Sequence, residues 1–362
     1  MTPFRLALIV ALLGSCAAPR TNPAPSASAP AMVAAPEFND CHVHLTNYIQ
    51  KGIDVRTFLS VMGGQVGRAA LFGIPLQQHW SHRVSGDDAP TYYLQADTPL
   101  YYYSFTDAFI AMAYKSLRPA EQERLDPMIT GFNPADMYAL DHIKRVLTTF
   151  PGVFTGIGEF SIHKEFVSSK VAGEVASLMD PALDRVLDFA AESGLLVLLH
   201  NDVDVPFAKA DAKPAYLAQM RELLARHPKT SIIWAHTGVG RVVRPVKKHT
   251  MMLEDFLKDP AYANVCFDLS WDEVAKYITA SPEAVEIMST MINRYPDRFL
   301  FGTDEVAPPD TETYLRVYRQ YAPLWEKLTP EAREKVRLTN YVRLFDAARV
   351  KVRAWEKANG LK

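Results

Sequence analysis

Eight short apolar segments alternate with longer amphipathic segments along most of this 362-residue chain. The apolar segments have the length and composition of buried strands, and we expect them at residues 38–44, 67–73, 128–132, 153–159, 195–200, 231–236, 263–269 and 298–303. The clearest helical stretches between them are residues 134–150, 181–193, 213–227 and 282–295. Strands that alternate with helices form parallel βαβ units. Eight units predict an α/β fold of the (β/α)8 TIM-barrel type.

The composition is that of an ordinary globular domain, with 48% hydrophobic and 22% charged residues. A net charge of −2 provides no basic surface for nucleic acid, so we expect a small-molecule substrate. Asn133-Pro134 and Asp180-Pro181 each place a capping residue before a proline, which predicts helix starts. We expect residues 37–362 to form a single domain whose long insertion, 75–127, and shorter polar stretch, 161–180, form pocket walls or lids.

The first residues have the pattern of an export signal rather than of the barrel. A basic Arg5 precedes an eight-residue apolar run, and Gly14-Ser15-Cys16 follows. This ending resembles a bacterial lipobox, which implies cleavage after residue 15 and a lipid on Cys16. An ordinary signal peptide with a chance cysteine is the alternative. Residues 16–36, rich in Pro, Ala and Ser, would be a flexible tether. The expected location is the bacterial cell envelope, lipid-anchored on the periplasmic face or at the cell surface.

Ionisable side chains stand at the ends of five of the expected strands. They are His42, His44, Glu159, His200, His236 and Asp304. A closed barrel brings its strand ends to one rim, where so many unpaired polar groups would be costly to bury. A divalent metal is a natural partner, and a mixture of imidazole and carboxylate suits Zn, Mn, Fe or Ni better than Ca or Mg. Cys41 and Cys266 lie inside expected strands, which favours buried free thiols over a disulfide.

Several short segments of the sequence resemble motifs of the amidohydrolase superfamily, which comprises metal-dependent hydrolases on a (β/α)8 barrel. They are Asp40-Cys41-His42-Val43-His44, Ala235-His236-Thr237-Gly238, Leu300-Phe301-Gly302-Thr303-Asp304 and the NYVRLF ending at 340–345. These segments are most similar to the amidohydrolase-related (amidohydrolase 2) branch, which includes decarboxylases and lactone or amide hydrolases. Gly156-Ile157-Gly158-Glu159 also resembles the fourth-strand glutamate of TatD-like metal-dependent hydrolases. The resemblance covers nearly all of residues 37–350.

The resemblance implies a set of roles for the strand-end residues. His42, His44 and His200 would hold the metal, and Asp304 would complete its ligand shell. Asp304 would then act as general base and acid toward a metal-activated water. His236 would polarise the substrate carbonyl, or bind a second metal if Glu159 bridges two ions. Many superfamily members have a carboxylated lysine on the fourth strand and this chain has none, so the choice between one ion and two depends on Glu159.

Further candidates follow the same strands. Arg241, Asp268 and Trp271 are expected to contact substrate, and weaker candidates are Asp40, His163, Lys164, Asn201 and Asp202. The leading prediction is a metal-dependent hydrolase of a small ester, lactone or amide, with zinc as the favoured ion. Alternatives are non-oxidative decarboxylation of a small carboxylic acid and TatD-like phosphodiester cleavage. A non-enzymatic envelope lipoprotein is the least favoured, because such a protein would not need the full set of ligands.

Overall fold

Nine strands form one sheet in the order β10-β9-β8-β7-β6-β5-β2-β1-β11, with every adjacent pair parallel. Their bounds are β1 Phe38–His44, β2 Val66–Phe72, β5 Leu125–Ile129, β6 Gly156–Ser161, β7 Leu196–His200, β8 Ile232–Trp234, β9 Val265–Asp268, β10 Phe299–Leu300 and β11 Glu305–Val306. The first eight in this list correspond to the eight predicted strands. β10 pairs with β9 and the nearby β11 pairs with β1, so the eighth chain segment closes the barrel.

The computed structural model describes residues 35–361 apart from 174, 210 and 247, and this part forms one unit. The predicted signal peptide, most of the predicted tether and Cys16 therefore lie outside the described residues. The longer helices that follow the strands are α1 Val55–Met62, α5 Ala139–Thr149, α7 Pro181–Ser193, α8 Leu217–Arg226, α9 His249–Lys258, α10 Asp272–Ile278, α11 Pro282–Arg294, α12 Thr311–Gln320, α13 Ala322–Lys327, α14 Pro330–Glu334 and α15 Asn340–Ala358.

One of the two predicted helix starts is correct and the other is wrong. Asp180 caps α7 by accepting a hydrogen bond from the Ala182 backbone N–H, as its position before a proline predicts. Asn133 instead accepts from the Ala135 N–H at 3.0 Å, and α5 begins only at residue 139. An Asn side chain that bonds its own backbone two residues on favours a turn, which competes with a helix at this point.

The interior of the barrel is filled by apolar side chains that alternate along the strands. Leu196 and Leu198 of β7 point inward, whereas Val197 and Leu199 join the larger cluster between the strands and the helices. Side chains two residues apart share a face of a strand, so the register that buries these two leucines also brings His200 to the inner side of the rim. Cys41 and Cys266 are buried free thiols, as predicted.

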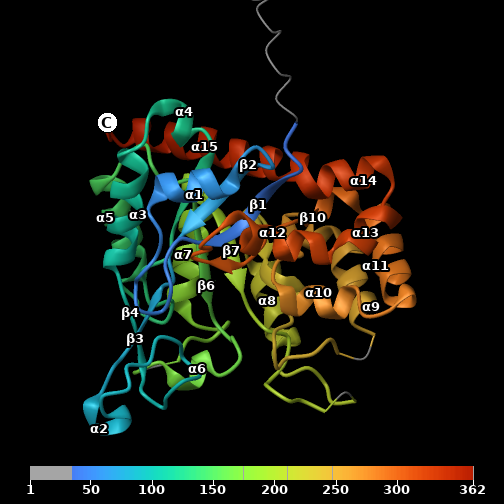
Figure 1. The fold of residues 1–362 in the computed structure, drawn as a ribbon, viewed down its shortest axis with the longest axis horizontal. Coiled ribbons are helices and arrows are strands. Elements are labelled where there is room, and N and C mark those ends of the chain that lie inside the picture. The colour runs from blue at the N-terminus through green and yellow to red at the C-terminus, as the bar shows by residue number, and fades with distance from the viewer. Residues whose placement is uncertain (1–34, 174, 210, 247, 362) are drawn as a thin grey trace, which may run out of the picture. The chain divides into compact units, whose positions relative to one another are not determined.

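One end of the barrel is closed by α15, which lies across the top of Figure 1, opposite α2 and α6. Its Tyr341, Phe345 and Ala348 complete the interior cluster. Arg349 also reaches the Leu125 carbonyl at the start of β5. This end is where the strands begin, so the strand ends that carry the ionisable residues face the other way.

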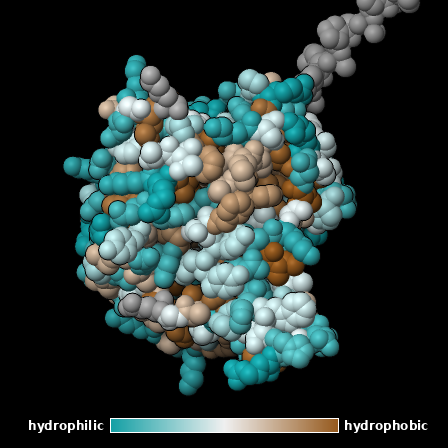
Figure 2. All heavy atoms as spheres, turned by 90° about the vertical axis from the view of Figure 1, so that its left-hand side faces the viewer, coloured by the Kyte–Doolittle hydropathy of each residue, from teal (hydrophilic) through white to brown (hydrophobic). Residues whose placement is uncertain are grey.

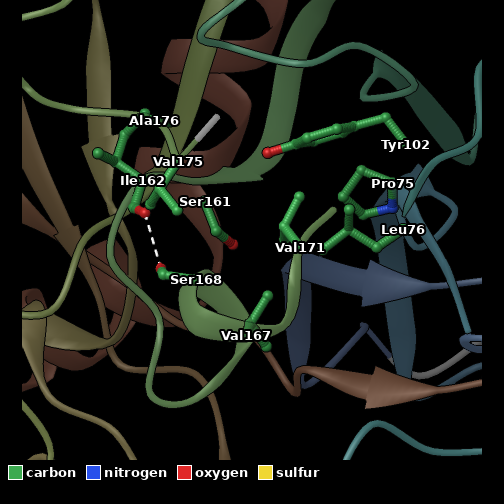
Figure 3. A pocket seen from close by; sticks show the side chains of 10 residues that line it. All are labelled: Pro75, Leu76, Tyr102, Ser161, Ile162, Val167, Ser168, Val171, Val175 and Ala176. Atoms are coloured by element: carbon green, nitrogen blue, oxygen red, sulfur yellow. Dashed lines mark hydrogen bonds between the residues drawn. The ribbon is translucent and has the colours of Figure 1, made fainter. Parts of the chain in front are cut away.

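Parts of the two predicted insertions pack against each other at that opposite end. The long insertion contains β3 Leu76–Gln78, β4 Leu100–Tyr102, α2 His82–Ser85, α3 Phe105–Lys115 and α4 Pro119–Gln122, and the short one contains α6 Val167–Lys170. Leu100 forms a bridge with Val171, and the Ala172 N–H donates to the Leu100 carbonyl at 2.9 Å. Figure 3 shows Tyr102 and Leu76 on one side of a small hollow and Ile162 on the other.

The outer surface is mostly hydrophilic on the side shown in Figure 2, with hydrophobic patches among the polar side chains. The helix α3 contributes three large exposed apolar side chains, from Phe105, Phe109 and Met112. Among the described residues, no helix combines the length and the apolar character needed to cross a membrane.

Candidate active site

The barrel brings all six predicted ionisable residues to one rim. His42 and His44 come from β1, Glu159 from β6 and His200 from the end of β7. His236 lies just after β8, and Asp304 lies between β10 and β11. The four imidazoles and the Glu159 carboxylate are at most 1% exposed, and the Asp304 side chain is 8% exposed.

The two histidines of β1 are oriented by acceptors that lie outside the group of six. His42 Nδ1 is 3.0 Å from Asp268 Oδ2, and His44 Nδ1 is 3.1 Å from the Gly73 carbonyl. A carboxylate and a carbonyl can only accept, so each Nδ1 carries the proton. The Nε2 atom of each ring is therefore left as a lone-pair donor toward the centre of the rim.

His200 and His236 are oriented in a similar way. His200 Nε2 is 3.1 Å from Asp202 Oδ1, which leaves Nδ1 facing inward. His236 Nδ1 is 2.9 Å from Ser270 Oγ. Because the Ser270 hydroxyl donates its proton to Asp268, its oxygen accepts from His236, and His236 Nε2 faces inward. Such outer acceptors fix the tautomer of metal-binding histidines in many proteins.

Two carboxylates lie between the four inward nitrogens. Asp304 Oδ1 is 3.2 Å from His42 Nε2 and 3.1 Å from His44 Nε2. Glu159 Oε1 is 2.6 Å from His200 Nδ1 and 3.6 Å from His236 Nε2, and Glu159 Oε2 is 3.4 Å from His44 Nε2. Glu159 is therefore shared between the histidines of β1 and those of β7 and β8.

The donor atoms could hold a divalent metal in three groups, one of which, His42, His236 and Asp268, takes one histidine from each of the other two. Of these two, the first is His42, His44 and Asp304, and the second is Glu159, His200 and His236, with the ligand atoms of each within 4.8 Å of one another. His42 Nε2 and His236 Nε2 are buried and make no hydrogen bond with any of the described residues, and an ion at the centre would supply a partner. The sequence-based expectation placed His200 with the first group, whereas the structure places it with the second.

The electrostatics of the rim favour ionised carboxylates. Burial opposes the ionisation of Asp304, but the neighbouring imidazoles of His42, His44 and His236 favour its charged form and hold its pKa well below the ordinary value. For Glu159, burial is likewise outweighed, in this case by Lys164 and the histidines, and the pKa is again well below the ordinary value. Burial lowers the pKa of His236 and so favours its neutral, ligating form.

The backbone at the strand ends is bent to aim these side chains. His236, Trp271 and Asp304 all have positive φ, at 56°, 81° and 54°. Non-glycine residues adopt this conformation only when their surroundings enforce it, and such residues are common at functional sites. Gly302 lets the last strand pass close to β1, because a Cβ there would lie 2.7 Å from the Cβ of His42.

The three predicted substrate contacts have different surroundings. The Trp271 ring lies 5.1 Å from the His236 ring, and Arg241 lies over the face of Trp271 at 5.6 Å and donates to the Tyr92 hydroxyl at 2.8 Å. Asp268 is fully buried, and its oxygens accept from His42, from the backbone N–H of His236 and from Ser270. Asp268 thus lies behind the histidines and orients them, and its expected contact with substrate stays a prediction.

Some residues around the rim were not among the predicted ones. Ser270 lies two residues after Asp268, and this spacing could have indicated a shared face of the chain. Tyr93 from the long insertion bonds Glu165, and although the sequence predicted this insertion as a pocket wall or lid, it did not indicate Tyr93. Asp40, a weaker candidate, accepts from the Thr303 hydroxyl at 2.6 Å and ties β1 to the last strand.

Comparison with known proteins gives one family and a common fold. The amidohydrolase family model matches residues 40–347. An amidohydrolase from Burkholderia multivorans, solved with bound zinc, aligns with 14% identity over 85% of this chain and 99% of its own, with a TM-score of 0.51. The crystal form of the same amidohydrolase with bound HEPES gives 12% identity, the same coverage and a TM-score of 0.51. At these identities the likeness shows the fold. No match was found among curated proteins.

Proposed function

The chain belongs to the amidohydrolase family and is a metal-dependent hydrolase of small substrates, and we propose that it cleaves the C–O or C–N bond of an ester, lactone or amide. The observation that carries this proposal is the pair of buried nitrogens, His42 Nε2 and His236 Nε2, that face Asp304 and Glu159 without a hydrogen-bond partner. These two nitrogens lie beside carboxylates and can give a lone pair, so a metal ion at the rim would supply their missing partner.

We propose that His42, His44 and Asp304 hold a divalent transition metal, with Glu159, His200 and His236 around it or around a second ion. When bound, such a metal makes water a nucleophile near neutral pH by lowering its pKa. Zinc is the favoured ion because imidazole and carboxylate ligands suit it, although Mn, Fe and Ni use the same donors.

Four further roles are assigned to residues of the chain: orienting the water, accepting its proton, polarising the substrate carbonyl and contacting the rest of the substrate. Asp304 is ionised and partly exposed, so it can orient a water and accept its proton at a carboxylate oxygen. His236 is fixed through Nδ1, so its Nε2 can polarise a substrate carbonyl. Trp271 and Arg241 lie beside His236, where they would contact the rest of the substrate, and Arg241 would suit an anionic group.

Elemental analysis of the purified protein tests the metal. We expect at least about one transition metal ion per folded chain, since the donor set matches a catalytic site with protein ligands and an open position. Folded protein that binds no transition metal at all would contradict the proposal.

Asp304→Asn tests the acid–base role. We expect kcat to fall by roughly 10²–10⁴-fold while most of the metal is kept, because a neutral amide can still coordinate but cannot take a proton. The matched control is Asp188→Asn, which removes a mostly exposed carboxylate on α7 and should leave kcat unchanged. Undiminished turnover in Asp304→Asn would remove Asp304 from this role.

A substrate screen decides the bond that is cleaved. Metal-loaded protein would be assayed with lactones, amides, phosphodiesters and small aromatic acids. Turnover of a lactone, ester or amide supports the proposed function. Exclusive release of CO2 from an acid would favour decarboxylation instead, and exclusive cleavage of phosphodiesters would favour the TatD-like alternative.

We also propose that Cys16 carries a lipid anchor after removal of residues 1–15, which would hold the enzyme in the cell envelope of a bacterium. The support is the basic and apolar start followed by Gly14-Ser15-Cys16. Cys16→Ser should release the protein from the membrane fraction. Equal membrane association of the variant would contradict the anchor.

A further inference from the structure

A buried lysine lies against the shared carboxylate of the rim. Lys164 follows Glu159 by five residues in the loop after β6 and is only 9% exposed. Its Nζ is 3.2 Å from Glu159 Oε1 and 3.4 Å from Glu159 Oε2. Among the described residues, Glu159 is the one acceptor recorded for this ammonium, which also faces the Trp271 ring at 6.0 Å.

The charge of Lys164 is maintained in spite of its burial. Burial alone would lower the pKa of a lysine, but Glu159 raises the pKa of Lys164 above its ordinary value. A buried charge needs a partner, and Lys164 takes as its partner the same carboxylate that a second metal ion would need. The two cations would therefore compete for Glu159.

Lys164 lies within hydrogen-bond distance of both carboxylate oxygens of Glu159 and is nearer to Oε1. Glu159 Oε1 accepts from Lys164 and is also the oxygen nearest to His200 Nδ1 and His236 Nε2. An ion held by Glu159, His200 and His236 would have to share Oε1 with the ammonium, in a buried place where charges are poorly screened. Among the described residues, no lysine forms a hydrogen bond or an ion pair with His42, His44 or Asp304, although Lys164 interacts electrostatically with Asp304.

We propose that Lys164 limits this centre to a single metal ion, held at His42, His44 and Asp304, by supplying at Glu159 the positive charge that a second ion would bring. The inference rests on the proposed metal function and deepens it. His200 and His236 are then free to hold the substrate, and the fourth-strand glutamate serves as an anchor for the lysine rather than as a bridge between two metals.

Metal stoichiometry tests the proposal directly. Metal-free wild type, Lys164→Met and Lys164→Arg would be equilibrated with excess Zn²⁺, passed through a desalting column and analysed for zinc per chain. We expect about one ion in wild type and in Lys164→Arg, and about two in Lys164→Met, because a two-metal site needs the freed carboxylate. Lys170→Met is the matched control and should bind as wild type does, since Lys170 donates to the backbone carbonyls of Tyr93 and Ala96 and pairs with Asp97, all in the long insertion.

A second measurement needs no variant. Two Mn²⁺ ions held about 4 Å apart in one site couple magnetically. Because we propose a single ion per site, the electron paramagnetic resonance spectrum of Mn²⁺-loaded wild type should be that of isolated, uncoupled ions. A coupled spectrum, or two zinc ions in wild type, would overturn the proposal. Binding of a single ion by folded Lys164→Met would also overturn the proposal. If Lys164→Met does not fold, Lys164→Gln takes its place in the experiment. Wild type that binds no ion would contradict the proposed function instead.

Discussion

The two ends of the barrel each bury a carboxylate, and the two carboxylates have very different partners. At the end closed by α15, Asp126 is fully buried and lies 2.8 Å from Arg68, 2.7 Å from Arg349 and 2.7 Å from the Tyr341 hydroxyl. At the opposite rim, Glu159 is equally buried, but its neighbours are histidines and one lysine.

The difference separates a structural carboxylate from a reactive one. Arginine is always charged and donates through a planar group, so it fixes Asp126 without any further ligand. Histidine is neutral or charged and can give a lone pair to a metal. The Nε2 atoms of His42 and His236 can give a lone pair, so the rim could hold a metal ion, whereas Arg68 and Arg349 beside Asp126 have no lone pair to give.

Metal removal should produce the largest difference between the two ends. Treatment with a chelator is expected to abolish turnover and to leave the barrel folded, because the apolar interior and the Asp126 cluster do not involve the metal ligands. Loss of a bound ion should lower the free energy of unfolding by at most about 4 kcal/mol if the ion was present at about 1,000 times its Kd. Circular dichroism measures whether the fold is kept, and urea unfolding measures the free energy of unfolding. Global unfolding on chelation would contradict the distinction between the closed end and the rim.

Removal of the structural carboxylate should have the opposite effect. Asp126→Ala leaves Arg68, Arg349 and Tyr341 without their shared acceptor, and we expect about 3 kcal/mol loss of unfolding free energy. The matched control is Asp346→Ala, which removes a half-exposed partner of Arg68 and should cost less than about 1 kcal/mol. Metal bound per folded chain should be unchanged in both variants, and a lower metal content in Asp126→Ala would contradict the separation of the two ends.

The rim could be predicted from the sequence to a greater extent than the closed end. The eight strands follow from local apolar segments, and the histidines and acids stand at their ends, so barrel closure alone brings His42, His200 and Asp304 to one rim. The partners of Asp126 could not be predicted in this way. Arg349 lies 223 residues away, and a salt bridge of that kind depends on how α15 packs and not on any local pattern.

The surroundings of the rim residues also depended on the tertiary structure. Asp268 ends a strand as the other rim residues do, yet its carboxylate points behind the histidines because the register of β9 places it beside His42. Lys164 follows Glu159 in a loop with no periodic pattern, so its return toward the rim could not be read from spacing. Local sequence patterns therefore predict which residues reach the rim, whereas the structure is needed to show which of them contact one another.

The support behind His42 should matter more than the support behind His200. In Asp268→Asn the new amide can present an N–H to His42 Nδ1, which favours the tautomer with a proton on Nε2 and so blocks the ligand atom. We expect metal affinity to fall by about 10–100-fold, as for other outer partners of metal ligands. Asp202→Asn makes the same change behind His200. If one ion is held at His42, His44 and Asp304, Asp202→Asn should lower the metal affinity less than Asp268→Asn does. Competition with a metal-binding dye measures the metal affinity of both variants.

A carboxylate near the rim that has no role in the site should give the smallest effect. Asp180 caps α7, which begins directly after the short insertion, and its side chain accepts only from the Ala182 backbone N–H among its recorded hydrogen bonds. Asp180→Ala should lower the unfolding free energy by about 1 kcal/mol, the usual effect of losing a helix cap. Metal affinity and kcat should be unchanged, because the distinction between the two ends depends on the partners of a carboxylate and not on its position along the barrel. A loss of metal in Asp180→Ala would show that the position of a carboxylate near the rim affects metal binding even without contacts to the ligands.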